Sequence, residues 1–290
     1  MNFNGNMQAD FDKNLKQILE IEPDYFHYTP FKGRSYFSCG DDDGPNITST
    51  SVHRLRPKDI KVVAAMGDSL TAALGSNANS IIGLIFENRG RSFSLGGDSH
   101  LESLVTFPNI LKKFNPNLTG YSKSGWDLFF LTTEGKGLNV AVSGDEANNM
   151  PGQVEVLVDR LRRDKSVDFE NDWKLVNLFI GGNDLCDFCT DKELHTPEAY
   201  IGYLRDALDL LYRELPKTFV NLISVINVGD IKYLNRGLIC TAIHSQVCPC
   251  AAFPKSIEQE VELQLIFNQY QNYTDNLVNS GRYEGNLISL

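Results

Sequence analysis

A short apolar run that ends in glycine constrains the fold of this chain more than any other stretch. Residues 62–66 read Val-Val-Ala-Ala-Met, and Gly67, Asp68 and Ser69 follow directly. Small and β-branched side chains before a glycine predict a buried strand that enters a tight turn, and residues 72–74 predict the start of a helix. A serine between a buried parallel strand and a helix lies at the sheet edge where open α/β folds bind ligands. Ser69 is therefore a candidate nucleophile, although serine also commonly caps helices.

The pattern of an apolar strand followed by glycine recurs along the chain. Four segments are predicted to be strands: 60–66, 138–144, 173–180 and 219–226. Four segments show helical periodicity or capping signals: 107–114, 151–161, 196–215 and 257–277. Strands that alternate with helices predict a parallel sheet with helices on both faces. Right-handed crossovers then place the three glycine-marked strand ends along one edge.

The residues at these strand ends suit acyl transfer. Ser69 offers a hydroxyl and a backbone N–H, Gly144 offers a backbone N–H that a substrate can approach closely, and Asn183 offers a side-chain amide. Hydrogen-bond donors that converge on one point stabilise the oxyanion of a tetrahedral intermediate. The sequence therefore predicts a serine hydrolase site built from three separate parts of the chain.

Composition and cysteine content narrow the class of protein. The net charge of −10 argues against a nucleic-acid-binding surface, and no apolar run reaches the length of about 20 residues that a membrane helix needs. The first residues lack the basic start and apolar core of a signal peptide. Six cysteines indicate disulfides, with 15 possible connectivities, whereas the spacing of Cys248 and Cys250 is poor for zinc. Three glycosylation sequons, at Asn46, Asn117 and Asn272, also suggest an extracellular setting.

Three other features receive simpler interpretations. Residues 96–100 contain a second Gly-Asp-Ser beside a histidine, but no convincing strand precedes it and no helix start follows, so we expect a turn. The acidic segment 40–45 lacks the ligand spacing of a calcium loop, and we expect it to be solvated. Residues 11–21 are predicted to form a short helix.

The blocks 67–70, Gly144 and 181–184 resemble three of the four sequence blocks of the GDSL, or SGNH, hydrolases. Further segments are similar to the phospholipase B subfamily in particular: 50–57, 107–116 and 178–189. The resemblance implies a flavodoxin-like three-layer α/β/α sandwich with a central parallel sheet. It implies an extracellular or cell-surface ester hydrolase that acts on phospholipids and lysophospholipids at a membrane surface, without a metal, an organic cofactor or an obligate protein partner.

The resemblance also assigns roles to residues. It implies Ser69 as the nucleophile, and the backbone N–H groups of Ser69 and Gly144 with the Asn183 side chain as the oxyanion hole. Asp68 and Asp184 are expected to support these groups.

One family block is absent from the sequence. The general base of this family is a histidine in an Asp-x-x-His motif after the fifth strand, and none of the five histidines of this chain stands in such a motif. We expect His195 and His244 to be loop residues. We expect residues 1–59 to form an N-terminal extension and residues 60–290 to form the hydrolase domain. Because the histidine block is absent, we expect this domain to be truncated before its last strand and poorly active.

Two alternatives to a phospholipid hydrolase stay open. One is a non-catalytic lipid-binding protein, and the other is an esterase for carbohydrate or cholesteryl esters. A smaller departure from the subfamily lies at residues 147–151. The subfamily usually has an acidic residue before an apolar residue and proline, whereas this chain has Asn149 before Met150 and Pro151.

Overall fold

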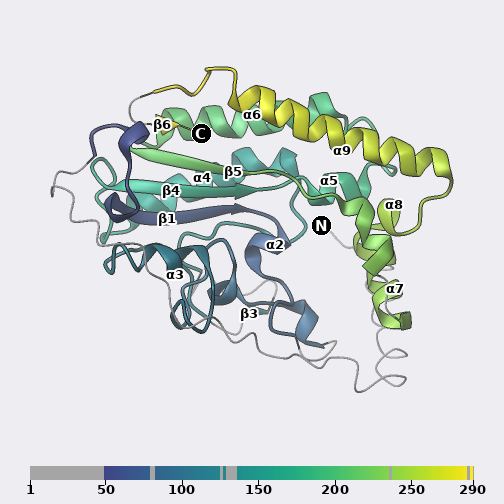
Figure 1. Cartoon of the computed structure of the whole chain (residues 1–290), viewed down its shortest axis with the longest axis horizontal. Helices are drawn as coiled ribbons and strands as arrows, with labels where there is room; N and C mark the ends of the chain where they lie inside the picture. The colour runs from purple at the N-terminus through teal and green to yellow at the C-terminus, as the bar shows by residue number, and fades with distance from the viewer. Residues whose placement is uncertain are drawn as a thin grey trace.

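A parallel sheet forms the centre of the protein (Figure 1). The structure is a computed structural model and describes residues 49–78, 82–124, 127–128, 136–234, 237–285 and 288–289. The sheet order is β1-β4-β5-β6, and its strands are β1 (Ile60–Gly67), β4 (Trp173–Phe179), β5 (Thr218–Ile223) and β6 (Ile288–Ser289). A separate antiparallel pair consists of β2 (Phe86–Glu87) and β3 (Asp127–Leu128). The strands predicted at 60–66, 173–180 and 219–226 are thus confirmed.

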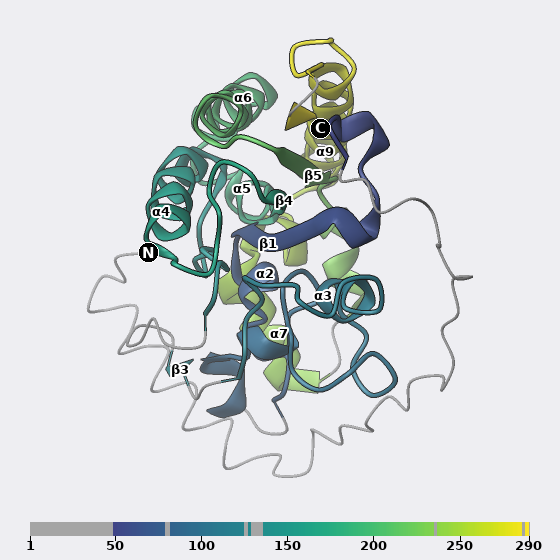
Figure 2. The same ribbon diagram turned by 90° about the vertical axis from the view of Figure 1, so that its left-hand side faces the viewer.

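Helices and loops cover the two faces of this sheet, as the sequence predicts (Figure 2). On one face, β1 side chains such as Val62 and Met66 pack against α4 (Met150–Arg163) and α6 (Pro197–Glu214). On the other face, Val63 and Ala65 pack against α3 (Phe107–Leu111) and nearby loops. α9 (Ile257–Val278) lies beside α6. The alternation of side chains along β1 therefore produces the three layers of an α/β/α sandwich.

Capping signals in the sequence mark the start of α6 correctly. The Thr196 hydroxyl accepts the N–H of Ala199 (3.1 Å), with Pro197 at the first helical position of α6.

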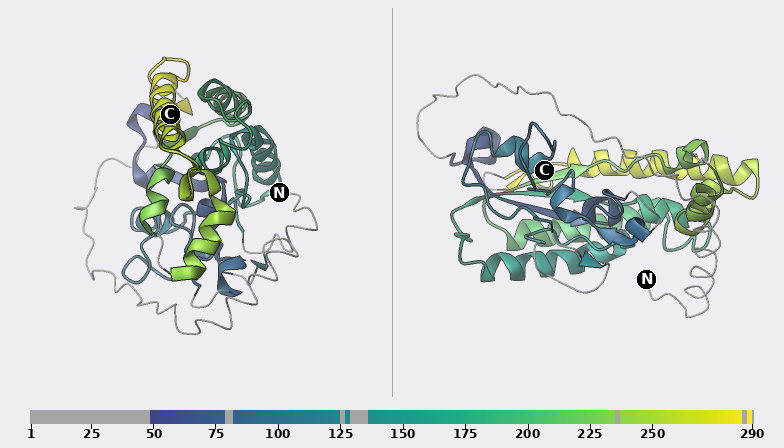
Figure 3. Two further views of the ribbon diagram at one scale, coloured as in Figure 1. Left: turned by 90° about the vertical axis from the view of Figure 1, so that its right-hand side faces the viewer. Right: turned by 90° about the horizontal axis from the view of Figure 1, so that it is seen from below.

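The short helices are α2 (Ser69–Ala72), α5 (Gly182–Asp187), α7 (Gly237–Val247) and α8 (Pro249–Ala252). The 3₁₀ turns are η1 (Val52–Arg54), η2 (Pro57–Asp59), η3 (Ile82–Ile85), η4 (Arg89–Arg91), η5 (Ala147–Asn149) and η6 (Val228–Leu234). α5, α7 and α8 lie beyond the ends of the strands (Figure 3).

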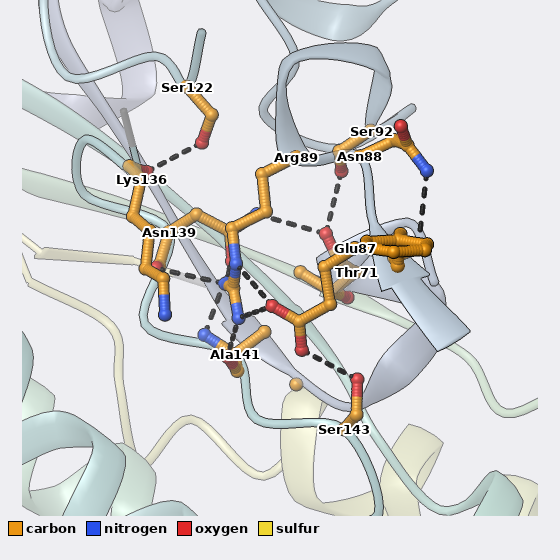
Figure 4. Close-up of polar contacts among 12 residues, drawn as sticks. Thr71, Glu87, Asn88, Arg89, Ser92, Ser122, Lys136, Asn139, Ala141 and Ser143 are labelled. Atoms are coloured by element: carbon orange, nitrogen blue, oxygen red, sulfur yellow. Dashed lines mark hydrogen bonds and ion pairs between the residues drawn. The ribbon is translucent and has the colours of Figure 1, made fainter. Parts of the chain in front are cut away.

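The prediction of a strand over 138–144 is wrong in detail. This segment runs beside β1, where Ala65 N–H donates to Leu138 O (3.1 Å) and Val140 N–H donates to Ala65 O (2.9 Å), but it forms only an isolated parallel bridge. The backbone carbonyls of Asn139 and Ala141 accept hydrogen bonds from an arginine side chain and not from a further strand (Figure 4). Arg89 donates to Asn139 O (3.2 Å) and, through Nη2, to Ala141 O (2.8 Å). The buried guanidinium thereby closes this edge of the sheet.

The helix after β1 also differs from the prediction. α2 begins at Ser69 and ends at Ala72, and Ala73 has a left-handed backbone with φ of 57°. The predicted helix start at 72–74 is therefore wrong, because the chain turns away at the point where that helix would begin. The prediction that Ser69 lies at a strand-to-helix junction is correct.

The ends of the chain are described in part. Residues 1–48 lie outside the described residues, and with them lie the helix predicted over 11–21, the acidic segment 40–45 and the Asn46 sequon. The backbone carbonyl of Ser49 accepts the indole N–H of Trp173 (2.8 Å), so the segment before β1 packs against the start of β4. At the other end, β6 pairs in parallel with the first two residues of β5. The expectation that the sheet lacks this strand is therefore wrong for Ile288 and Ser289, which pair with Thr218 and Phe219.

Two disulfides join the start of α8 to α5 and to the residues just after α5. They are Cys186–Cys248 and Cys189–Cys250. The disulfide interpretation is confirmed for these four cysteines, and the zinc alternative for Cys186 and Cys189 is wrong because both sulfurs are bonded. Cys240 is in no disulfide among the described residues, and Cys39 lies outside them. The disulfides anchor the helix whose first turn contains Asn183.

Candidate active site

The three candidate residues lie where the parallel strands end. Ser69 is the first residue of α2, directly after β1, and Asn183 is the second residue of α5, after β4. β1 and β4 are adjacent and parallel, and their last residues are paired. Gly144 follows the segment in which Val142 N–H donates to Gly67 O (3.1 Å). The fold therefore brings three distant parts of the chain to one edge of the sheet.

A hydrogen-bonded path through one glutamine joins these parts. The buried Gln153 side chain of α4 accepts the N–H of Gly67 (2.9 Å), and its Nε2 donates to Gly67 O (2.8 Å) and to Asp145 Oδ2 (2.8 Å). The backbone carbonyl of Asp145 accepts a hydrogen from Asn183 Nδ2 (2.7 Å). Since an amide nitrogen carries two hydrogens, this bond orients the Asn183 side chain and leaves a second hydrogen for a ligand.

The backbone of Gly67 requires glycine at the end of β1. Its φ is +146°, and a Cβ there would lie 2.2 Å from Phe179 O and 2.7 Å from Thr71 Oγ1. We expect Gly67→Ala to lower the free energy of unfolding by about 2–4 kcal/mol, because backbone strain and overpacking each cost about 1–3 kcal/mol. Urea unfolding measures this change.

The matched control for Gly67→Ala is Gly152→Ala in α4. A Cβ at Gly152 meets nothing within 4 Å, and alanine is favoured over glycine in a helix by about 0.5–1 kcal/mol. The two substitutions add the same methyl group and should change stability in opposite directions. Equal stability of the two variants would contradict the requirement for glycine at position 67.

Asp68 is buried between the two strand ends. Its Oδ1 accepts the N–H of Leu70 (2.8 Å), so Asp68 is the N-cap of α2 and the alternative that Ser69 caps this helix is wrong. Burial raises the pKa of Asp68 to about 6, helped by the nearby Asp145 and opposed by the N–H groups of its own turn. Its Oδ2 would lie 3.7 Å from a Cβ at Gly182, so the carboxylate also faces the first turn of α5.

Asp184 is the second buried carboxylate of the site. Its two oxygens lie 3.1 and 3.2 Å from the N–H of Ala147, which donates to them. Burial raises the pKa of Asp184 to about 7, although this N–H favours the charged form. The contact ties the turn of α5 that carries Asn183 to the residues just after Gly144.

His195 lies in a turn, as predicted, but it is buried against this site, which the sequence did not indicate. The prediction that His244 is a loop residue is wrong, because His244 lies in α7. Its Nε2 lies 3.2 Å from Glu146 Oε1, within ion-pair distance but outside hydrogen-bond geometry. Burial alone would lower the pKa of His195, but Glu146 and Asp184 outweigh it and the pKa is raised. Across the ranges that the structure describes, no three or more His, Cys, Asp or Glu side chains are grouped in a way that could hold a metal ion.

The second Gly-Asp-Ser is a turn, as predicted. The Asp98 carboxylate accepts the backbone N–H of Ser124 (2.8 Å) and is also bonded to the Ser124 hydroxyl. Ser99 is exposed, has a left-handed backbone and bonds to the Ser103 hydroxyl (2.5 Å). The carboxylate of this motif therefore organises a loop on the α3 side of the sheet.

Comparison with known proteins identifies a group of relatives. A family model described as GDSL-like lipase/acylhydrolase matches residues 63–287. Phospholipase B1, membrane-associated, from Homo sapiens is 44% identical over 234 residues, which are 80% of this chain and 16% of that protein. The Mus musculus protein of the same name is 37% identical over 288 residues, 97% of this chain and 18% of the relative. The Rattus norvegicus protein is 39% identical over 290 residues, 97% of this chain and 19% of the relative. The chain thus spans less than a fifth of the length of these relatives.

Proposed function

Because the chain belongs to the GDSL-like lipase/acylhydrolase family, we propose that it is a phospholipase B-like serine ester hydrolase that releases fatty acids from phospholipids and lysophospholipids. The substrate class follows the names of the relatives. The observation that carries the proposal is the path from Gly67 through Gln153 and Asp145 to Asn183, because it fixes the end of the nucleophile's strand relative to an amide donor.

The proposed reaction proceeds through an acyl-enzyme. Ser69 Oγ loses its proton and attacks the ester carbonyl carbon, and the carbonyl oxygen becomes an oxyanion. The N–H groups of Ser69 and Gly144 and the Asn183 amide donate to that oxygen. Collapse of the intermediate expels the alcohol portion of the lipid, and water then hydrolyses the acyl-enzyme to release the fatty acid. Asp68 and Asp184 hold the two helix starts that carry these groups.

The proton acceptor for Ser69 is proposed to be absent from residues 1–290. The family resemblance assigns it to a histidine in an Asp-x-x-His motif, which this sequence does not contain. His195 Nε2 lies 3.2 Å from Glu146 Oε1, so this ring nitrogen faces a carboxylate. Imidazole in the buffer supplies the missing chemical group, so the assays proposed for this chain are carried out in imidazole.

Asn183 offers a direct test of the oxyanion hole. We expect Asn183→Ala to lower kcat for p-nitrophenyl butyrate by about 10²–10³-fold, because loss of one oxyanion donor costs about that factor. The control is Asn171→Ala, since Asn171 is exposed and bonds to Asp168 in the turn that precedes β4, away from the strand ends. A rate for Asn183→Ala equal to that of Asn171→Ala would remove Asn183 from the oxyanion hole.

A substrate panel tests the proposed reaction itself. Fatty acid release is measured from phosphatidylcholine, lysophosphatidylcholine, a cholesteryl ester and an acetylated sugar, each with the unaltered chain and with Ser69→Ala. The proposal expects Ser69-dependent release from the two phospholipids above the other esters. Binding of phospholipid vesicles without Ser69-dependent release from any substrate would favour a non-catalytic lipid-binding protein.

We place the protein outside the cell or at its surface. Disulfides persist mainly in oxidising compartments, and the argument from the two in this chain is supported by exposed asparagines in the sequons at Asn117 and Asn272. In the described part of the chain, no helix combines the length and the apolar character needed to span a bilayer. Digestion of secreted protein with an endoglycosidase, followed by mass measurement, tests the two sequons.

A further inference from the structure

A buried ion pair lies beside Ser143, the residue that precedes Gly144 (Figure 4). Arg89 and Glu87 have side chains only 5% and 3% exposed, and Arg89 Nη2 lies 2.6 Å from Glu87 Oε2. The other oxygen of the carboxylate, Oε1, accepts a hydrogen bond from the Ser143 hydroxyl (2.8 Å). Ser143 is itself buried and directly precedes Gly144. A buried charge is therefore used to hold the residue next to a proposed oxyanion donor.

The same network reaches the helix that starts with Ser69. Arg89 Nη1 donates to the side-chain oxygen of Asn139 (3.0 Å), and Asn139 Nδ2 donates to the backbone carbonyl of Thr71 in α2 (2.9 Å). The hydroxyl of Ser92 donates to that same carbonyl (2.7 Å). The chain of contacts from Glu87 thus ends on both elements that would supply backbone donors to the oxyanion.

The carbonyls of Asn139 and Ala141 give a reason to bury Arg89, but closing the sheet edge does not require the second contact of Glu87, with Ser143. A buried ion pair is often no more stabilising than well-packed apolar side chains of the same volume, but it fixes directions that apolar packing leaves adjustable. The N–H of Gly144 belongs to the peptide unit that begins at Ser143. Gly144 has a φ of +90° and no Cβ, so no side chain of its own restrains this part of the backbone. Anchoring the Ser143 side chain restricts rotation of this peptide unit.

We propose that Ser143 and Glu87 are positioning residues that aim the Gly144 N–H at the oxyanion. The inference rests on the proposed function, since it presumes an oxyanion at this edge of the sheet. Neither side chain touches the reacting atoms: Ser143 acts through the Gly144 backbone, and Glu87 acts through Ser143. The position of a donor matters because oxyanion donors act at about 2.7–3.1 Å from the charged oxygen.

Labelling by an alkyl fluorophosphonate tests this inference without depending on turnover. Ser69 Oγ gives its proton to imidazole and bonds to phosphorus, fluoride leaves, and the phosphoryl oxygen gains charge in the oxyanion hole. We expect Ser143→Ala to lower the maximal labelling rate about tenfold. This loss is smaller than the 10²–10³-fold loss of rate, roughly, that follows removal of a whole oxyanion donor, because the Gly144 N–H is displaced and not removed. The half-saturating probe concentration should change less than about twofold, because the hydroxyl does not contact the ligand. Intact-protein mass spectrometry measures both values.

The matched control is Ser94→Ala. Ser94 is also buried, and its hydroxyl has no hydrogen-bond partner among the described residues, so the same truncation should leave labelling unchanged. Ser143→Thr keeps the hydroxyl and should label at the rate of the unaltered chain. A rate for Ser143→Ala equal to that of Ser94→Ala, or equal slow labelling of the alanine and threonine variants with unchanged melting temperatures, would overturn the positioning role. Labelling of a residue other than Ser69, found by peptide mapping, would instead overturn the proposed function.

Discussion

Residues 1–290 should hydrolyse lysophosphatidylcholine about 10⁴–10⁶-fold more slowly than a serine hydrolase with a complete triad, and imidazole should recover part of that rate. Serine hydrolases that lose one triad member fall by about these factors and keep the contribution of the oxyanion hole and of substrate binding. The expected rise is first order in imidazole and follows the neutral form of the buffer, because only neutral imidazole accepts the proton of Ser69. Fatty acid release at fixed pH and ionic strength measures it.

Two serine variants identify the source of the imidazole-dependent rate. Ser69→Ala should remove it entirely, whereas Ser99→Ala should leave it unchanged, since Ser99 belongs to the exposed turn of the second Gly-Asp-Ser. Enzymes ordinarily turn over about 10 times per second. A turnover of that order without imidazole would show that a base is already present. In that case His195 and its partner Glu146 would be the first residues to replace.

Much of the fold follows from local patterns in the sequence. β4 is buried along its whole length and reads as a continuous apolar run interrupted by Lys174 and Asn177, so its identity as a central strand was predictable. α6 was predictable because Thr196 and Pro197 mark its start. The segment 138–144 was mistaken for a complete strand because its apolar residues do face β1. Its outer carbonyls bind Arg89, which lies about 50 residues earlier, and no local pattern reveals that contact.

The candidate site was predictable only where short motifs mark it. Ser69, Gly144 and Asn183 each follow a strand end, and parallel topology alone predicts that such residues meet at one edge. Gln153 was missed because it resembles any polar residue of an amphipathic helix, although it bonds to Gly67, 86 positions away. The burial of His195 was missed for another reason, because it depends on packing between α6, α9 and the turn after Gly144 rather than on residue spacing.

Arg89→Met should lower the free energy of unfolding by about 3–5 kcal/mol. Removal of one partner of a buried ion pair costs about this much, because the other charge stays buried without compensation. Here the variant leaves the Glu87 carboxylate unpaired and also removes the donor to the backbone carbonyl of Ala141. Denaturant unfolding monitored by tryptophan fluorescence measures the loss.

A surface arginine and a double variant separate buried charge from the loss of an arginine side chain. Arg163→Met removes the same group from an exposed pair with Asp159, whose side chains are 79% and 53% exposed, and should change stability by at most about 0.5 kcal/mol. Glu87→Gln combined with Arg89→Met removes both charges and should cost less than Arg89→Met alone. The amide that replaces the carboxylate in this double variant still offers an oxygen to Ser143. We therefore expect the double variant to keep nearly the normal rate of fluorophosphonate labelling even though it is less stable than the unaltered chain. If Arg89→Met were no less stable than Arg163→Met, the buried pair could not be what holds the edge of the sheet beside Gly144.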